Sequence, residues 1–237
     1  MARLFHDAQQ AIDDIGDGAT IMIGGFGGFG MPENLIRALR NKGSQSLTII
    51  TNSAGMEENG IGLLCLNKQV RKIVTTDLAE NSLFENLVLK GELQIELSPQ
   101  GTFAERIRAG GAGLGGFYTP TGYGTIVAEN KETRFWQGRN YVLELPLRAQ
   151  FGLVKAWRGD PAGNLVYRAN ARNFNPLMAM AGKITIAEVE ELVKPGDLNP
   201  DEIHTPGIYV HRIFEGSNYE KRIEQRTVRK LANKPIS

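Results

Sequence analysis

The sequence predicts an α/β fold: an open, mostly parallel sheet with helices on both faces, and added mixed β structure in the second half. Short apolar runs alternate with segments of helical periodicity through the first half, which is the pattern of successive βα units. Glycines and prolines separate these segments. The second half is richer in extended pattern, so mixed strand directions are expected there.

The elements of the first half follow from the spacing of apolar residues. Helical spacing predicts a helix over 6–15, and an apolar run predicts a buried strand at 19–24. Pro32 suits the first position of a helix that Gly43 ends. The other elements predicted here are strands at 47–51, 71–76 and 93–97, a helix around 82–90, and a helix that starts at 102.

The composition changes at residue 109. Residues 109–125 are a stretch of glycine, threonine, proline and tyrosine, which we interpret as a functional loop. Beyond it, extended segments surround a turn near Gly138, and a helix is expected near 175–182. We predict a single domain over 1–237, with a tail at 218–237.

Composition and charge exclude several classes of function. Lys plus Arg number 27 and Asp plus Glu number 26, so there is no basic excess for nucleic acid. No apolar run reaches the roughly 18 residues of a membrane span, and the N-terminus resembles no targeting peptide. We therefore expect a cytoplasmic protein without a membrane partner. The single cysteine, Cys65, lies in an apolar run and is expected to be a buried hydrophobe.

A glycine loop is the strongest candidate site. Its residues are Gly24, Gly25, Phe26, Gly27, Gly28, Phe29 and Gly30. Because the loop follows a predicted strand and precedes a predicted helix, its N–H groups are free, and the helix N-terminus adds about half a positive charge. A phosphate, a carboxylate or a developing oxyanion suits such a position.

A dinucleotide-binding loop is one alternative, because Gly25, Gly27 and Gly30 have the spacing G-x-G-x-x-G. Such a loop expects an acidic residue about twenty positions on, where this chain has Asn52. Pro32 also places the helix start after the third glycine. A purely structural turn is a second alternative.

The segment GDGATIMIGGFGGFGMPENLI at 16–36 resembles the signature of family I coenzyme A transferases. Further resemblances are TNSAG at 51–55, GELQIELSPQGTFAERIRAGGAG at 91–113, FYTPTGYGT at 117–125, LVKAWRGDPAGNLVYRANARNFNPL at 153–177 and EIHTPGIYVHRI at 202–213. Together they cover most of the chain and resemble an A-type half, closest to the succinyl-CoA:3-ketoacid (3-oxoacid) type. Acetate/butyrate and 3-oxoadipate types share the same motifs. The resemblance also implies an open α/β sheet.

The resemblance implies CoA transfer between carboxylic acids through a glutamyl-CoA thioester on a B-type partner subunit. CoA is then a substrate, with small carboxylic acids as the other substrates, and no tightly bound cofactor is implied. The family's Ser-Glu-Asn-Gly segment, which carries the glutamate, does not occur here. Glu58-Asn59-Gly60 repeats three of its letters but follows Glu57, so we interpret Glu58 as a loop acid. We therefore expect an obligate hetero-oligomer.

The resemblance also suggests site residues. Gln100 resembles a family glutamine whose amide stabilises the oxyanion, the alternative being an amide that only stabilises a loop. The loop from Gly24 to Gly30 would contribute backbone amides to the CoA site. Candidates for the substrate entrance, or for a structural loop, are Gly110, Gly111, Gly113, Tyr118, Thr119 and Tyr123.

Arg172, Asn173 and Asn175 have side chains that suit a carboxylate or phosphate, although a structural interface between strands is the favoured interpretation. No metal site is expected, because the three histidines are far apart in sequence and no metal or serine-hydrolase motif occurs. A different class stays open: a non-catalytic protein that binds CoA thioesters or sugar phosphates on the related fold.

Overall fold

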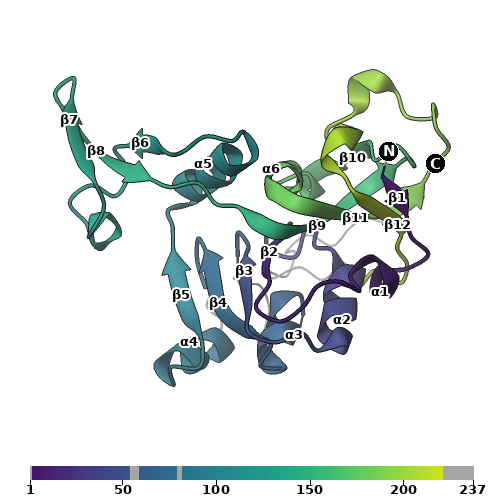
Figure 1. Ribbon diagram of the computed structural model, residues 1–237, viewed down its shortest axis with the longest axis horizontal. Coiled ribbons are helices and arrows are strands. Elements are labelled where there is room, and N and C mark those ends of the chain that lie inside the picture. Colours follow the sequence, from purple (N-terminus) through teal and green to yellow (C-terminus); the bar gives the residue numbers. More distant parts are fainter. Residues whose placement is uncertain (1, 54–58, 79–81, 221–237) are drawn as a thin grey trace, which may run out of the picture.

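The structure is a computed structural model that describes residues 2–53, 59–78 and 82–220 (Figure 1). The strands of its main sheet are β1 (Arg3–Leu4), β2 (Thr20–Ile23), β3 (Leu47–Ile50), β4 (Val70–Thr75), β5 (Gln94–Leu97), β9 (Ala149–Gly159), β10 (Leu165–Val166), β11 (Gly182–Leu192) and β12 (Arg212–Glu215). Their order is β1-β12-β11-β9-β2-β3-β4-β5, and β10 pairs with β9. Only β10 is antiparallel to its neighbour. The predicted open, mostly parallel sheet is confirmed.

Helices cover both faces of this sheet, as predicted (Figure 1). They are α1 (Ala8–Ala11), α2 (Glu33–Lys42), α3 (Ile61–Leu66), α4 (Ser82–Leu89), α5 (Gln100–Gly111) and α6 (Asn175–Ala181). Because successive strand residues point to opposite faces, Ile21 and Ile23 join the core under α1 to α4, whereas Met22 joins the core under α5 and α6. The apolar strands therefore serve two cores at once.

A small antiparallel sheet projects from the body at the upper left of Figure 1. It consists of β6 (Phe117–Thr119), β7 (Thr133–Trp136) and β8 (Arg139–Glu144), in the order β6-β8-β7. The predicted turn near Gly138 joins β7 to β8, and Gly138 has the positive φ of 75° that such a turn needs. Among the named strands of the described residues, antiparallel pairing thus occurs in this sheet and at β10.

Three predicted boundaries were wrong, and one helix was missed. The first helix is only α1, and the helix expected from 102 begins at Gln100, because Pro99 supplies the extended residue before it. The expected loop over 109–125 contains the end of α5 and strand β6. The short helix α3 was missed, since its six apolar residues are too few to show a helical period. The single domain stays a prediction, and residues 221–237 lie outside the described part.

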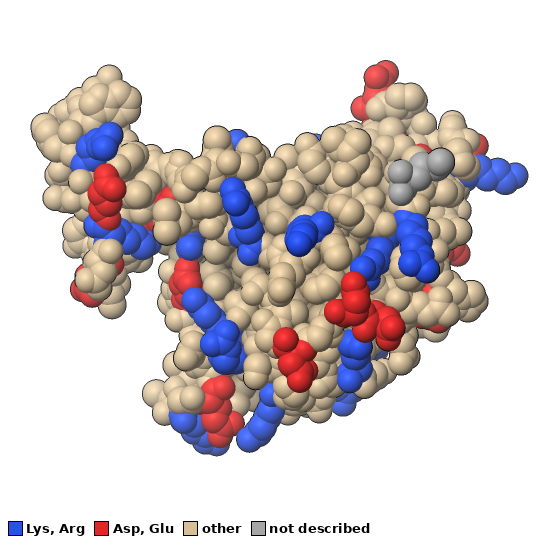
Figure 2. Space-filling view, viewed as in Figure 1, with Lys and Arg blue, Asp and Glu red and all other residues tan. Residues whose placement is uncertain are grey.

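The centre of the sheet is a topological switch point. From β2 the chain moves outward through β3, β4 and β5, and later builds β9, β11 and β12 on the other side. Open α/β sheets bind ligands outside the carboxyl ends of their strands at such a point. Figure 2 shows acidic and basic side chains interspersed over one face of the molecule. Within the described residues, no helix has the length and apolarity needed to cross a membrane.

Candidate functional site

The glycine loop lies at this switch point, directly after β2. The Gly24 N–H donates to the Leu153 carbonyl of β9 (2.9 Å), while Phe26 and Phe29 exchange backbone hydrogen bonds of 3.0 and 2.9 Å. Left-handed backbone occurs at Gly25 (φ 119°), Gly27 (53°), Gly28 (86°) and Gly30 (69°). The N–H groups of these four glycines have no acceptor within the part of the chain that the structure describes. They remain as donors for a ligand.

Asn175, the first residue of α6, holds this loop against β9. Its fully buried side chain accepts the Lys155 N–H at 3.0 Å and donates to the carbonyls of Gly30 (3.0 Å) and Ala171 (2.9 Å). A Cβ on Gly24 would lie 1.9 Å from Asn175 Oδ1, so glycine at this position is what lets the Asn175 side chain keep its place. Asn175 therefore links the loop, through its hydrogen bond to the Gly30 carbonyl, to β9 and to Ala171.

Asn173 makes a similar contact two residues earlier in the chain. Its Nδ2 donates to the Phe29 carbonyl at 2.9 Å and to the Asn170 carbonyl at 2.7 Å. Both asparagines thus bind protein backbone, whereas a role of Arg172 toward a carboxylate or phosphate stays a prediction. Their role is to position the loop.

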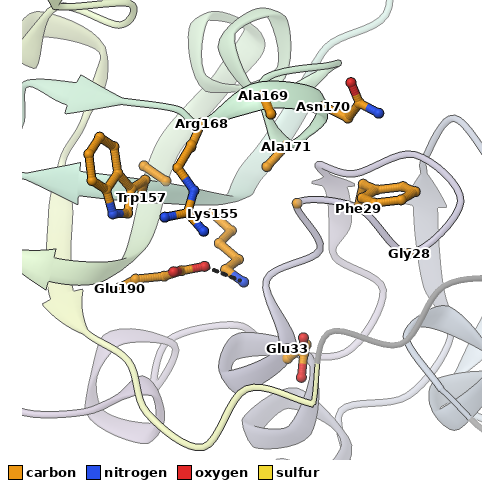
Figure 3. A pocket seen from close by; sticks show the side chains of 12 residues that line it. Gly28, Phe29, Glu33, Lys155, Trp157, Arg168, Ala169, Asn170, Ala171 and Glu190 are labelled. Atoms are coloured by element: carbon orange, nitrogen blue, oxygen red, sulfur yellow. Dashed lines mark ion pairs between the residues drawn. The ribbon is translucent and has the colours of Figure 1, made fainter. Parts of the chain in front are cut away.

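A pocket of about 300 Å³ lies between the loop and the carboxyl ends of β9 and β11 (Figure 3). One wall is the backbone of Gly28–Gly30. The facing wall carries Lys155 and Trp157 of β9, Arg168 after β10, and Glu190 of β11, and Lys155 Nζ lies 3.1 Å from a Glu190 carboxylate oxygen. The pocket combines cationic groups with free backbone donors.

Gln100 lies at the same carboxyl edge but outside this pocket. It is the first residue of α5, after β5, and its exposed side chain reaches Asn52, the second residue after β3. Gln100 Nε2 donates to Asn52 Oδ1 at 3.0 Å. Asn52 is fully buried, and its Nδ2 has no acceptor in the described structure. Sequence reasoning treated Asn52 only as the place of a missing acid.

The comparisons with known proteins decide the family, because a family model described as "Coenzyme A transferase" matches residues 5–216. The chain belongs to the coenzyme A transferase family. It is 52% identical over 99% of its length to the A-type chain of a probable succinyl-CoA:3-ketoacid coenzyme A transferase of Bacillus subtilis, 98% of which is covered. It is 55% identical over 96% of its length to the A-type chain of the succinyl-CoA:3-ketoacid coenzyme A transferase of Xanthomonas campestris, 95% of which is covered.

Longer relatives and solved structures match too. The human "Succinyl-CoA:3-ketoacid coenzyme A transferase 2, mitochondrial" is 48% identical over 97% of this chain, which spans 48% of that protein. An Escherichia coli O157:H7 acyl-CoA transferase, solved as a thioester complex with CoA, superposes with a TM-score of 0.82 at 20% identity. The match covers 93% of this chain and 48% of that structure. Glutaconate coenzyme A-transferase from Acidaminococcus fermentans gives 0.75 at 18% identity, covering 90% of this chain and 75% of that one. These two likenesses show the fold.

Two glycines expected at the transferase's substrate entrance or in a structural loop have close packing contacts, and their entrance role stays a prediction. A Cβ on Gly110 would lie 1.8 Å from the Leu147 carbonyl oxygen, and one on Gly111 would lie 2.9 Å from the Met180 Cβ. Both glycines let the end of α5 pack closely on its neighbours. The entrance role of Gly113, Tyr118, Thr119 and Tyr123 stays a prediction.

Two other candidates have simple outcomes. Cys65 is buried, as expected, and burial raises the pKa of its thiol to about 12. It is therefore an inert hydrophobe at neutral pH. Glu58 lies outside the described residues, so its interpretation as a loop acid stays a prediction.

The two histidines of the second half accept hydrogen bonds from the backbone. Nδ1 of His204 accepts the Tyr167 N–H at 2.9 Å, and Nδ1 of His211 accepts the Thr185 N–H at 3.0 Å. Burial is the main cause that lowers the pKa of both imidazoles. No group of His, Cys, Asp and Glu in the described ranges is arranged to hold a metal ion.

Sequence reasoning also missed a buried polar cluster beside the pocket. Glu188 of β11 is fully buried, accepts the Leu35 N–H of α2 at 2.9 Å, and has its pKa raised to about 7 by burial. Lys155 Nζ lies 3.8 Å from the centre of the Tyr219 ring. The available signal was the presence of Lys155 and Glu188 inside otherwise apolar strands, where an ionisable residue needs a partner.

Proposed function

We propose that this chain is the A-type half of a two-chain transferase that moves CoA from succinyl-CoA to a 3-oxoacid such as acetoacetate. The observation that carries this proposal is the identity of 52–55% with bacterial proteins named as the A-type chain of that enzyme, over almost the full length of both chains. A free-donor loop at the switch point of an α/β sheet agrees with a site for an anionic substrate.

The glycine loop is proposed as this chain's part of the CoA site, with backbone amides as the contacts. Positive φ at Gly25, Gly27, Gly28 and Gly30 turns their N–H groups away from intramolecular acceptors. Asn175 fixes the loop in this form without ligand. Such preorganisation lowers the free energy that binding must spend on ordering the loop.

Gln100 is proposed as an oxyanion donor, together with the neighbouring Asn52. One hydrogen bond between the two amides orients both side chains at the end of their strands. Asn52 Nδ2 is buried and unpaired in the described structure, which is costly unless a ligand oxygen accepts from it. Preorganised donors of this kind act on the tetrahedral oxyanion of each acyl-transfer step.

In the proposed reaction the B-type partner provides a glutamate, which attacks the thioester carbonyl of succinyl-CoA. The C–S bond breaks, giving a mixed anhydride and CoA thiolate, which then attacks the glutamyl carbonyl and releases succinate. Acetoacetate attacks the resulting glutamyl-CoA thioester, and the steps reverse to give acetoacetyl-CoA and free glutamate. This chain supplies donors, and its partner supplies the nucleophile.

The partner and the location rest on the same relatives. We propose a hetero-oligomer with a B-type chain, because this chain spans nearly all of its bacterial A-type relatives but about half of the human one. We propose the cytoplasm as its compartment on the likeness to the bacterial chains. The mitochondrial relatives, at 46–48% identity, make location the property to test by fractionation.

The decisive experiment is CoA transfer from succinyl-CoA to acetoacetate by the purified chain, alone and mixed with a B-type chain from the same genome. Activity in the mixture alone supports the proposal. Activity of the chain alone contradicts it and makes Glu58 the first residue to mutate. No activity in either assay favours acetate, butyrate or 3-oxoadipate as the acid. No activity with any of these acids favours a non-catalytic binding protein.

Gln100→Ala should lower kcat in the mixture by a factor of about 100 to 1,000, with little change in the KM for succinyl-CoA. The physical reason is the loss of a donor whose interaction is strongest in the transition state. Gln9→Ala, an exposed amide on α1, is the matched control and should keep full activity. Equal rates for the two variants would remove Gln100 from the mechanism.

A further inference from the structure

We infer that the pocket beside the glycine loop contains an oxyanion subsite centred on Arg168, which binds either a phosphate of CoA or a carboxylate of the acid substrate. The inference rests on the proposed function and adds a residue to it. Arg168 directly follows Tyr167 and precedes the 3-10 helix η2 (Ala169–Ala171), and its side chain points into the pocket (Figure 3).

The Arg168 guanidinium lies over the Trp157 ring and has no ionic partner within the described residues. Its guanidinium carbon lies 5.5 Å from the centre of the Trp157 ring, and none of the hydrogen bonds and ion pairs between described residues involves its side chain. Arg158 lies at the same distance from that ring but pairs with Glu191 at 3.1 Å. The cation–π contact with Trp157 uses the face of the guanidinium and no N–H donor, so the fork of N–H groups is left for an oxyanion.

The other charges of the pocket are compensated. Lys155 pairs with Glu190 at 3.1 Å, and the carboxylate of Glu33 accepts the Glu220 N–H at 2.8 Å and lies 4.0 Å from Arg37. The charge of Arg168 is therefore the one that stays unneutralised among the described ionisable residues that line the pocket. An anionic group of the ligand supplies the missing charge.

The facing wall complements the guanidinium. The N–H groups of Gly28 and Gly30 are unpaired in the described structure, and hydrogen bonds from Asn173 and Asn175 to the loop's carbonyls keep this wall in place. An oxyanion between the walls accepts from an arginine fork on one side and from backbone amides on the other. This donor set matches phosphate and carboxylate geometry.

The first test is steady-state kinetics of Arg168→Gln mixed with the B-type chain. Loss of a charge-assisted contact should raise the KM of the ligand that carries the oxyanion about 10- to 100-fold. Arg168→Lys should recover part of the loss, because it restores the charge without the fork. Arg158→Gln is the matched control, since it removes the same charge from the other contact on Trp157 and should behave as wild type.

Two comparisons identify the source of the oxyanion. If it is a CoA phosphate, the effect of Arg168→Gln should disappear with succinyl-pantetheine, which carries no phosphate. If it is a carboxylate, the effect should persist with succinyl-pantetheine and should fall more heavily on succinate, which has two carboxylates, than on acetoacetate. If Arg168→Gln matches Arg158→Gln with every substrate, there is no subsite.

A binding measurement separates this inference from the proposed function. The chain has two tryptophans, so Trp136→Phe leaves Trp157 as its reporter beside Arg168. Titration with CoA, succinate or inorganic phosphate should change the Trp157 fluorescence, and Arg168→Gln should abolish the change while keeping the melting temperature within a few degrees. This holds even if no CoA transfer occurs. A Trp157 signal that is unchanged by all three probes, or equal in Arg168→Gln, would overturn the subsite.

Discussion

The chain has two glycine-rich segments, and they use glycine differently. In the loop from Gly24 to Gly30, four positive φ angles leave backbone N–H groups unpaired at the carboxyl edge of the sheet, as far as the structure describes the chain. In the segment 109–125, Gly110 and Gly111 allow α5 to pack against its neighbours at close range. A high glycine content therefore indicates a backbone that needs either positive φ angles or close approach to other atoms. Whether the glycines serve ligand binding or packing follows only from where the segment lies relative to the sheet.

The largest expected effect contrasts Gly110→Ala with Gly24→Ala. The new Cβ of Gly110→Ala would lie 1.8 Å from a backbone carbonyl, so the main chain must move, and we expect a loss of about 3 kcal/mol in the free energy of unfolding. In Gly24→Ala the clash is with the Asn175 side chain at 1.9 Å, which can rotate away. That movement breaks the hydrogen bonds that hold the loop. Compared with Gly110→Ala, Gly24→Ala should therefore lose less stability and more CoA-transfer activity.

Urea unfolding and transfer assays on folded protein with the B-type chain measure both quantities. Gly16→Ala is the control, because nothing lies within 4 Å of its Cβ. The contrast between the two segments fails if Gly24→Ala keeps its activity, or if Gly110→Ala loses less stability than Gly24→Ala.

The second effect is a dependence of stability on pH. The loop from Gly24 to Gly30 leads into α2, and the Leu35 N–H of α2 donates to the buried, titratable carboxyl group of Glu188. Burial raises the Glu188 pKa to about 7, against the Leu35 and Asn34 hydrogen bonds and the Lys155 charge, which lower it. Between the unfolded value near 4.5 and pH 7 the folded state binds more protons. Stability should therefore fall by about 2–3 kcal/mol as pH rises through this window and level off above it.

Glu188→Gln removes this titration and keeps the hydrogen-bonding shape. Unfolding free energies from pH 5 to 8 should give a wild-type-minus-variant difference that declines through the folded pKa of about 7 and levels off toward the upper end of this range. His204 and His211 cancel in that difference, since both proteins contain them. A difference that is constant with pH would show that Glu188 keeps one protonation state throughout.

The sequence predicts most of the sheet because its strands are apolar runs between glycines and prolines, and the order of elements follows from βα alternation. It also predicts the glycine loop, whose signal is local. Arg168 and Asn52 could not be predicted, since the role of each depends on a contact made only in the folded chain, with Trp157 and Gln100 respectively. Contacts of this kind depend on the tertiary fold.

The third effect tests whether Asn175 and Gly24 act as one unit. Asn175→Ala removes three hydrogen bonds but also frees the space that a Cβ at position 24 needs. The double variant Gly24→Ala/Asn175→Ala should therefore be more stable than the sum of the single losses by about 1–2 kcal/mol. Urea unfolding of the four proteins measures this coupling. Additive losses would mean that the loop tolerates a Cβ at Gly24 by another movement.

The smallest effect tests whether the other glycines of the segment 109–125 matter only through their own backbone conformation. Gly113 has φ 75° and no atom within 4 Å of its Cβ, so Gly113→Ala should lose about 1 kcal/mol from left-handed strain alone. Gly115 has the same open space without a positive φ, and Gly115→Ala should be neutral or slightly stabilising. Thermal unfolding separates the two. Because neither new methyl group meets the folded chain, a loss of CoA transfer in Gly115→Ala at unchanged stability requires contact with substrate or partner, and would place this segment at the entrance.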